Sequence, residues 1–255
     1  MKTIHAFLGA AALIAFPGLA AAAPAAPASP AVRNVVLVHG AFADGSGWQP
    51  VAEILEKDGY TVSIVQEPET SFVDDVTATN RILDRVQGRA VLVGHSYGGA
   101  IITEAGNNLH VASLVYVAGF VPDEGDTILS QIEKNPPAAT SIAPTSDGYL
   151  LIDPARFAAD FAADLPPAQA RFMAISQVPW NKAILSTPIT APAWKSKPAY
   201  GIVAQQDRMI NPDLERAMYR HAGASVTEIK GSHAVFISQP RAVANVIEQA
   251  ARASR

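Results

Sequence analysis

The sequence predicts an α/β fold: a mostly parallel sheet of about six strands, flanked by helices and carrying a helical cap insertion. Two observations predict it. Short apolar runs alternate with stretches whose apolar residues recur at helical spacing, which is typical of βα units. A proline-rich segment at 121–197 then interrupts the alternation. The 255 residues, 49% of them hydrophobic, suffice for one large core.

The predicted strands are continuous apolar runs rather than alternating ones, which indicates a sheet covered on both faces. In chain order they lie at 34–38, 61–65, 90–93, 113–118, 199–204 and 225–229. Helices are predicted at 49–57, at 73–86 and directly after Ser96. Pro240 suits the first turn of a closing helix, with Ser238 as its cap.

The segment at 121–197 contains ten prolines, with short helix-like pieces at 127–133, 155–163 and 168–177 between them. Its aromatic side chains favour a cap above a binding site, because such folds bind ligands outside the carboxyl ends of the strands. The large apolar residues of the segment include Phe157, Phe161, Phe172, Met173 and Trp180. The alternative is an ordinary surface excursion that packs on the sheet.

The first 23 residues predict a signal peptide, with a positive Lys2, an apolar stretch at 4–19 and small residues up to position 23. An uncleaved membrane anchor and a disordered tail are the alternatives, but the apolar stretch is shorter than the ~20 residues that a spanning helix needs. An Ala/Pro linker follows at 24–32, before a single domain at 33–255. We expect export to the periplasm or the medium, without stable membrane insertion after cleavage.

The composition excludes several classes of function. A net charge of −4 gives no basic surface for nucleic acid. The absence of cysteine excludes disulfides, thiolate metal sites and a cysteine nucleophile. The sequence does not predict an oligomeric state.

The stretch Gly94-His95-Ser96-Tyr97-Gly98 matches Gly-x-Ser-x-Gly, between a predicted strand and a predicted helix. A nucleophile turn forces its serine into a strained backbone conformation, and the glycines allow strand and helix to approach each other. The alternative is a plain glycine turn. Serine is a weak nucleophile and needs a general base.

Among six histidines, only His233 combines a loop after the last strand with the chain order Ser, acid, His. A histidine that merely supports a turn is the alternative. Asp207, after the fifth strand, is the candidate acid, and Asp123, after the fourth, competes with it. Backbone N–H groups of Ala41 and Tyr97 are the candidate oxyanion donors, with Phe42 as the alternative to Ala41.

Five motifs in this order resemble the small esterase branch of the alpha/beta-hydrolase superfamily. They are VLVHGAFADGSGW, VLVGHSYGG, VYVAGFVPDEGD, AQQDRMI and KGSHAVFISQP. The branch holds plant methylesterases, hydroxynitrile lyases and bacterial pyrethroid-hydrolysing carboxylesterases, and the resemblance covers residues 35–251.

The resemblance implies a triad of Ser96, Asp207 and His233, no cofactor, and hydrolysis of carboxylic esters through an acyl-enzyme. The aromatic residues of the cap and the many alanines favour an apolar pocket for a small or medium ester, and no metal site is predicted. Lyases of this branch carry threonine and lysine where this chain has Gly40 and Ala234, so an esterase is favoured over a lyase. A hydrolase-like ligand sensor and a perhydrolase remain alternatives. The sequence does not identify the acyl or alcohol group.

Overall fold

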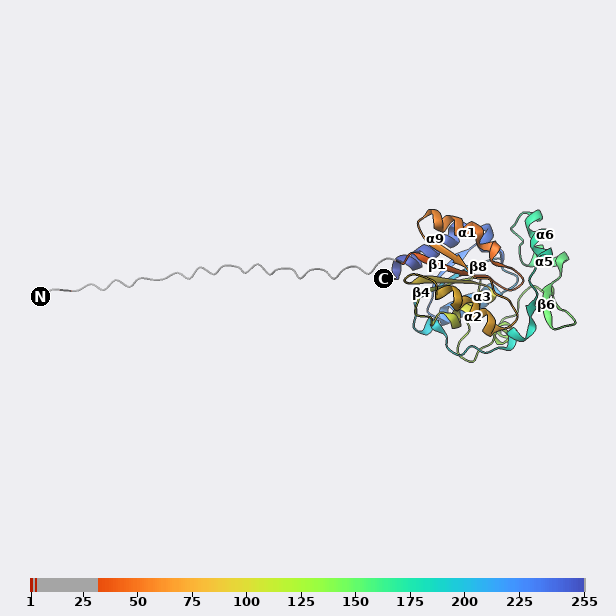
Figure 1. Ribbon diagram of the computed structural model, residues 1–255, viewed down its shortest axis with the longest axis horizontal. Coiled ribbons are helices and arrows are strands. Elements are labelled where there is room, and N and C mark those ends of the chain that lie inside the picture. Colours follow the sequence, from red (N-terminus) through yellow and green to blue (C-terminus); the bar gives the residue numbers. More distant parts are fainter. Residues whose placement is uncertain (2, 4–31, 255) are drawn as a thin grey trace.

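Six parallel strands form the central sheet of the computed structural model (Figure 1). The strands are β1 (Asn34–Val38), β2 (Thr61–Ile64), β3 (Ala90–His95), β4 (Val111–Val117), β8 (Ala199–Ala204) and β9 (Ser225–Ile229), in the order β2-β1-β3-β4-β8-β9. Each was predicted to within two residues at either end. The fold class predicted from the sequence is confirmed.

The structure describes residues 1, 3 and 32–254. The predicted signal peptide and most of the predicted linker lie outside the described residues, so both stay predictions. In the part of the chain that is described, no helix is long and apolar enough to cross a membrane.

Burial explains why the central strands read as continuous apolar runs. Every residue of β3 and β4 is buried, because neighbouring strands flank both edges and helices cover both faces. The outer strands β2 and β9 are partly exposed. A register irregularity between Ala90 and Val91 marks the start of the β3–β4 pairing.

Helices cover both faces of the sheet. They are α1 (Gln49–Lys57), α2 (Phe72–Leu83), α3 (Tyr97–Ala105), α4 (Ile128–Lys134), α5 (Pro154–Asp160), α6 (Pro167–Ile175), α7 (Pro212–His221), α8 (Val235–Ser238) and α9 (Pro240–Ala253). Figure 1 shows α1 and α9 over one face and α2 and α3 over the other. Pro240 does begin α9, but Ser238 does not cap it, because Ser238 ends α8 and donates to Asp164 instead.

The cap segment, residues 121–197, contains the three predicted helical pieces as α4, α5 and α6. It also contains a small antiparallel sheet that the sequence did not predict. This sheet pairs β5 (Ile142–Pro144), β6 (Tyr149–Ile152) and β7 (Trp180–Asn181). Two short 3₁₀ helices, Lys182–Ser186 and Ala193–Lys195, then lead into β8. Figure 1 places α5, α6 and β6 together beyond one end of the central sheet.

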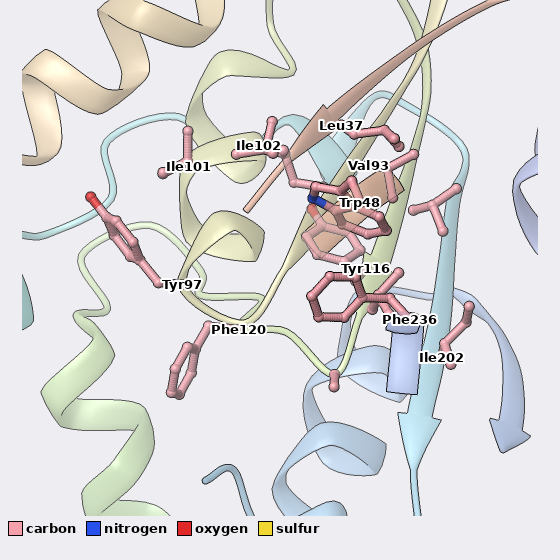
Figure 2. Packing of buried hydrophobic residues seen from close by; sticks show 14 of the residues in the cluster. Leu37, Trp48, Val93, Tyr97, Ile101, Ile102, Tyr116, Phe120, Ile202 and Phe236 are labelled. Carbon is pink, nitrogen blue, oxygen red and sulfur yellow. The ribbon is translucent and has the colours of Figure 1, made fainter. Parts of the chain in front are cut away.

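The core lies between the sheet and its helices (Figure 2). Leu37, Val93 and Ile202 come from three different strands, and Trp48 and Phe236 pack beside them with ring centroids 4.6 Å apart. Trp48 belongs to a 3₁₀ helix at Gly45–Trp48 and is fully buried. Burying side chains of this size stabilises the fold by roughly 1.5–3 kcal/mol each.

Candidate active site

Ser96 lies at the sharp turn between β3 and α3, at the carboxyl edge of the sheet. Its backbone has φ 53° and ψ −121°, in the region that side chains rarely adopt. Three hydrogen bonds hold this strained turn: Ser96 N–H donates to Val117 O at 3.2 Å, and Ser96 O accepts from Gly99 and Phe120 N–H at 3.0 and 3.1 Å. Strain maintained in this way is typical of functional sites.

The glycines around Ser96 are required by close backbone contacts. A Cβ on Gly94 would lie 2.4 Å from the Gly98 carbonyl oxygen, and one on Gly98 would lie 2.3 Å from His39 O. A Cβ on Gly99 would lie 2.4 Å from Phe120 O. Because backbone atoms of packed elements cannot move aside cheaply, only glycine fits these positions.

His233 and Asp207 form a buried pair. His233 Nδ1 lies 2.6 Å from Asp207 Oδ2, with both side chains almost fully shielded from solvent. The other carboxylate oxygen, Oδ1, accepts from the Met209 and Ile210 N–H groups at 2.7 and 3.0 Å. These bonds fix the position of the carboxylate. The carboxylate in turn orients the His233 ring, so that Nδ1 faces Asp207 and Nε2 is on the side away from it.

His95 ties the His233 loop to the nucleophile turn. Its Nε2–H donates to the His233 carbonyl oxygen at 2.9 Å, and the two imidazole centroids are 4.6 Å apart. Burial, followed by the nearby His233, lowers the pKa of His95 well below its ordinary value, so His95 is neutral. Within residues 32–254, no hydrogen bond joins Ser96 Oγ to His233. Such bonds often form only in the substrate complex.

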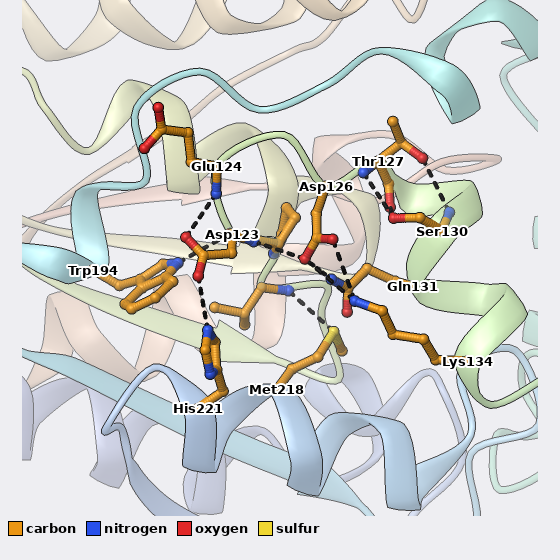
Figure 3. Close-up of polar contacts among 12 residues, drawn as sticks. Asp123, Glu124, Asp126, Thr127, Ser130, Gln131, Lys134, Trp194, Met218 and His221 are labelled. Atoms are coloured by element: carbon orange, nitrogen blue, oxygen red, sulfur yellow. Dashed lines mark hydrogen bonds and ion pairs between the residues drawn. The ribbon is translucent and has the colours of Figure 1, made fainter.

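Asp123, the competing acid, lies in a different cluster (Figure 3). Its carboxylate contacts Lys195 Nζ at 2.6 Å and accepts from His221 Nε2–H at 2.8 Å. The hydrogen bonds from Lys195 and His221 lower the pKa of Asp123 far below its ordinary value. The cluster borders a cavity of about 520 Å³ between α4 and α7. The structure thus brings Asp207, and not Asp123, to His233.

The residues of the first loop, 39–42, lie beside Ser96. A Cβ on Gly40 would lie 2.7 Å from Ser96 Cβ. The N–H groups of Ala41 and Tyr97 donate to no protein acceptor in the described chain, which leaves them available for a substrate oxygen. The Phe42 N–H likewise donates to no protein acceptor within residues 32–254, so Ala41 and Phe42 both stay candidates for the loop donor.

Comparison with known proteins identifies the family to which the chain belongs. A family model described as "Alpha/beta hydrolase family" matches residues 35–246. The chain belongs to the alpha/beta hydrolase family. The pyrethroid hydrolase of Sphingobium wenxiniae is 28% identical over 246 residues, covering 85% of this chain and 86% of that protein. A carbendazim hydrolyzing esterase of Nocardioides sp. is 35% identical over 126 residues, covering 43% of this chain and 51% of that protein.

Solved structures show the same fold. A pyrethroid hydrolase from Sphingobium faniae superposes with a TM-score of 0.74 at 24% identity, covering 86% of this chain and 97% of that one. Tomato methylketone synthase I superposes with a TM-score of 0.76 at 17% identity, covering 88% and 99%. The predicted esterase branch, and with it an ester-hydrolysing enzyme, is confirmed at the level of the family and its named relatives. The roles of the site residues stay predictions.

The cap segment of this alpha/beta hydrolase holds the His233 loop through contacts that were not predicted from the sequence. Asp164 accepts from the Ser232 N–H at 3.0 Å and from Ser238 Oγ at 2.7 Å, and it also binds Ser232 Oγ. Phe161 O accepts from the Ala234 N–H at 3.0 Å. No local sequence pattern signals such a contact, because the partners are about seventy positions apart.

Glu215 is a second residue that the sequence did not reveal. It is fully buried on α7, where its Oε2 accepts from the Ala204 N–H at 3.0 Å and its carboxyl group contacts Asp207. Burial and the neighbouring Asp207 raise the pKa of Glu215 well above its ordinary value. Both causes favour the uncharged form of a carboxyl group, so Glu215 is neutral.

A buried group of ionisable side chains lies behind the 39–42 loop. It contains His39, Glu67, Glu69 and Asp75, and it reaches Tyr97, whose hydroxyl donates to Asp75 Oδ2 at 2.5 Å. Asp75 Oδ1 accepts from the Glu69 N–H at 2.8 Å. Burial and the nearby Asp75 and Glu67 raise the pKa of Glu69 to about 10, and burial raises that of Asp75 to about 6.

The buried Glu69 predicts a pH-dependent stability. In the folded protein Glu69 keeps its proton up to about pH 10, whereas in the unfolded chain it releases the proton near its ordinary pKa of 4.5. The free energy of unfolding therefore falls as the pH rises from the ordinary pKa to the raised one. Its neighbours Glu67, Asp75 and His39 share this environment. Glu69→Gln cannot ionise, so its melting temperature should exceed that of the unsubstituted protein by more at pH 8.5 than at pH 5.5.

The exposed Glu56→Gln serves as the control for the Glu69 prediction, since it removes a carboxylate from α1 without touching the buried group. Its melting temperature should follow that of the unsubstituted protein at both pH values. A constant offset of Glu69→Gln between pH 5.5 and 8.5 would show that Glu69 is already ionised in the folded state.

Proposed function

We propose that this protein is a serine carboxylesterase that uses Ser96, His233 and Asp207. The observation that carries the proposal is the strained Ser96 turn next to a buried His233–Asp207 pair 2.6 Å apart. Nucleophile, base and orienting acid are the three roles that ester hydrolysis by serine requires. The relatives named esterase and pyrethroid hydrolase support the same reaction class.

The proposed reaction has two halves. His233 Nε2 takes the Ser96 proton as Oγ attacks the ester carbonyl carbon, and Asp207 stabilises the imidazolium that forms. The Ala41 and Tyr97 N–H groups bind the resulting oxyanion. Protonated His233 then gives its proton to the departing alkoxide, which leaves an acyl group on Ser96. Water repeats these steps and releases the carboxylic acid.

The substrate is proposed to be a small or medium ester with an apolar part. A cavity of about 220 Å³ lies between α6 and the loop after β1. Large apolar side chains line part of it, and polar ones line the rest: Phe42, Phe172, Met173, Phe236 and Ile237, with Asp44, Ser46, Gln49, Gln169 and Ser176. Because Phe42 belongs to the 39–42 loop, this cavity adjoins the proposed oxyanion site. The apolar part of the lining favours apolar groups, which lose contact with water on binding.

Trapping of the acyl-enzyme tests the proposed reaction. Mixed rapidly with p-nitrophenyl acetate, the protein should release about one equivalent of p-nitrophenolate in a burst, as acylation outpaces deacylation. Acid quenching followed by mass spectrometry should find the acetyl group on the peptide that contains Ser96. An acetyl group on another residue, with turnover intact, would overturn the assignment.

The same experiment separates the alternative functions. A ligand sensor would show a single slow turnover across an ester panel. A perhydrolase would form peracid from hydrogen peroxide and the acyl-enzyme faster than it hydrolyses the ester.

Phe172 on α6 should determine affinity for bulky apolar esters. Its side chain is 65% exposed and lines the cavity, so Phe172→Ala should raise KM for naphthyl or long-chain esters at least several-fold while leaving p-nitrophenyl acetate unaffected. Ile175→Ala is the matched control, because Ile175 is 66% exposed on the same helix but does not line the cavity. Equal effects of the two substitutions would argue against binding at this cavity.

A further inference from the structure

Two buried side chains that the proposed reaction does not use lie directly behind the 39–42 loop. His39 follows β1 and Glu67 follows β2, and since these strands are parallel neighbours, their carboxyl ends bring the two residues together. We propose that His39 and Glu67 are positioning residues, which fix the Gly40–Ala41 peptide so that the Ala41 N–H faces the substrate. This inference rests on the proposed esterase function.

The first step is the bond between His39 and the loop. His39 Nδ1 lies 3.0 Å from the Gly40 carbonyl oxygen. A carbonyl oxygen only accepts hydrogen bonds, so Nδ1 must carry a proton and donate it. The Gly40 carbonyl is therefore held toward the His39 ring.

The second step follows from peptide geometry. In a trans peptide the C=O of one residue and the N–H of the next point in opposite directions. With the Gly40 carbonyl turned to His39, the Ala41 N–H points away from that ring. Gly40 itself packs against Ser96, and within residues 32–254 the Ala41 N–H has no protein acceptor. The orientation of this one peptide thus decides whether the loop presents a donor.

The third step is the support that Glu67 gives to His39. Glu67 Oε2 is in direct contact with His39 Nε2, and the Glu67 N–H lies 3.1 Å from the same nitrogen. Both side chains are nearly inaccessible to solvent. Burial lowers the pKa of His39, but the charge and hydrogen bond of Glu67 raise it above its ordinary value. Burial also raises the pKa of Glu67 above its ordinary value.

Removal of the Glu67 side chain would leave the imidazole held only by the Gly40 carbonyl oxygen and the backbone N–H of residue 67, without the carboxyl group that contacts Nε2. Glu67→Leu is expected to lower kcat by about 10- to 100-fold with KM unchanged, since complete loss of an oxyanion donor costs ~10²–10³ in rate. Glu67→Gln, which can still bond to Nε2, should retain kcat to within about threefold. An aryl boronic acid that forms a tetrahedral adduct on Ser96 should bind Glu67→Leu more weakly by the same factor as kcat falls.

His39 provides the second, independent variant. The amide nitrogen of asparagine can take the place of imidazole Nδ1, so His39→Asn should retain more kcat than His39→Leu. Glu67→Leu should cost nothing further once His39 is Asn, because Glu67 acts only through the imidazole. Additive losses in this double variant would overturn the inference, as would a Glu67→Leu protein whose kcat and boronic acid affinity are unchanged.

Asp160→Asn is the matched control, because it neutralises another buried carboxylate, on α5, without contact to the 39–42 loop. Its kcat and its affinity for the boronic acid should equal those of the unsubstituted protein. Circular dichroism and the melting temperature establish that each variant is folded. If the unsubstituted protein hydrolyses no ester at all, the proposed esterase function is wrong. If the unsubstituted protein is active and Glu67→Leu has the same kcat as Asp160→Asn, only the inference about His39 and Glu67 is wrong.

Discussion

Replacement of Ser96 by alanine should lower kcat/KM for p-nitrophenyl acetate by about 10⁴–10⁶, because loss of a triad nucleophile leaves only binding and oxyanion stabilisation. The fold should persist, since the strained turn is held by backbone hydrogen bonds to Val117, Gly99 and Phe120 and not by the hydroxyl. Steady-state kinetics with circular dichroism measure both. Activity within tenfold of the unsubstituted protein would contradict the role of Ser96.

The two candidate acids provide the control for this result. Asp207→Asn should lower kcat by about 10⁴, because the amide stabilises the wrong imidazole tautomer. Asp123→Asn should leave kcat unchanged, since its carboxylate pairs with Lys195 and His221. The reverse ranking would return Asp123 to the role of triad acid.

Gly98→Ala should cause the largest loss of stability. The added Cβ would lie 2.3 Å from the His39 carbonyl oxygen and 2.9 Å from that of Val38, both backbone atoms at the end of a buried strand. Forcing β1 and α3 apart is expected to lower the free energy of unfolding by about 3 kcal/mol or more. That corresponds to roughly 6–12 °C in melting temperature for a domain of this size.

Gly88→Ala gives the comparison for the Gly98 prediction. Gly88 has φ +91°, but nothing lies within 4 Å of an added Cβ, so its substitution adds backbone strain without a collision. That strain is worth roughly 1–2 kcal/mol. A melting temperature for Gly98→Ala above that of Gly88→Ala would show that β1 and α3 tolerate separation.

The central sheet could be predicted because its signal is local. Each buried strand is a continuous apolar run, and the strand at 34–38 was predicted to the residue. The sheet of the cap segment could not be predicted, because β7 has two residues, β5 ends in Pro144, and the paired residues of β6 and β7 are thirty or more positions apart. Pairing of such short strands is decided by tertiary contacts and not by propensity.

The candidate site was predictable to the extent that it follows motifs. Gly-x-Ser-x-Gly pointed to Ser96, and strand-end position with chain order pointed to Asp207 and His233. Glu67 and Glu215 carried no such signal, because a charged residue in a loop or on a helix is usually exposed. Their burial depends on how β2 and α7 pack, which no local pattern encodes.

The tether from Asp164 and Phe161 to the His233 loop has a consequence for redesign. A chimera that exchanges the whole of 121–197 for another enzyme's segment would remove the support of the proposed base together with the substrate-facing surface. Replacement segments should begin beyond Asp164, on α6. The exposed face of α6 carries Phe172, and α6 contributes none of the contacts that Asp164 and Phe161 make with the His233 loop. Substrate specificity can thus change through substitutions on α6, while the part of the insertion that contains Phe161 and Asp164 must keep its contacts with the loop of the proposed base.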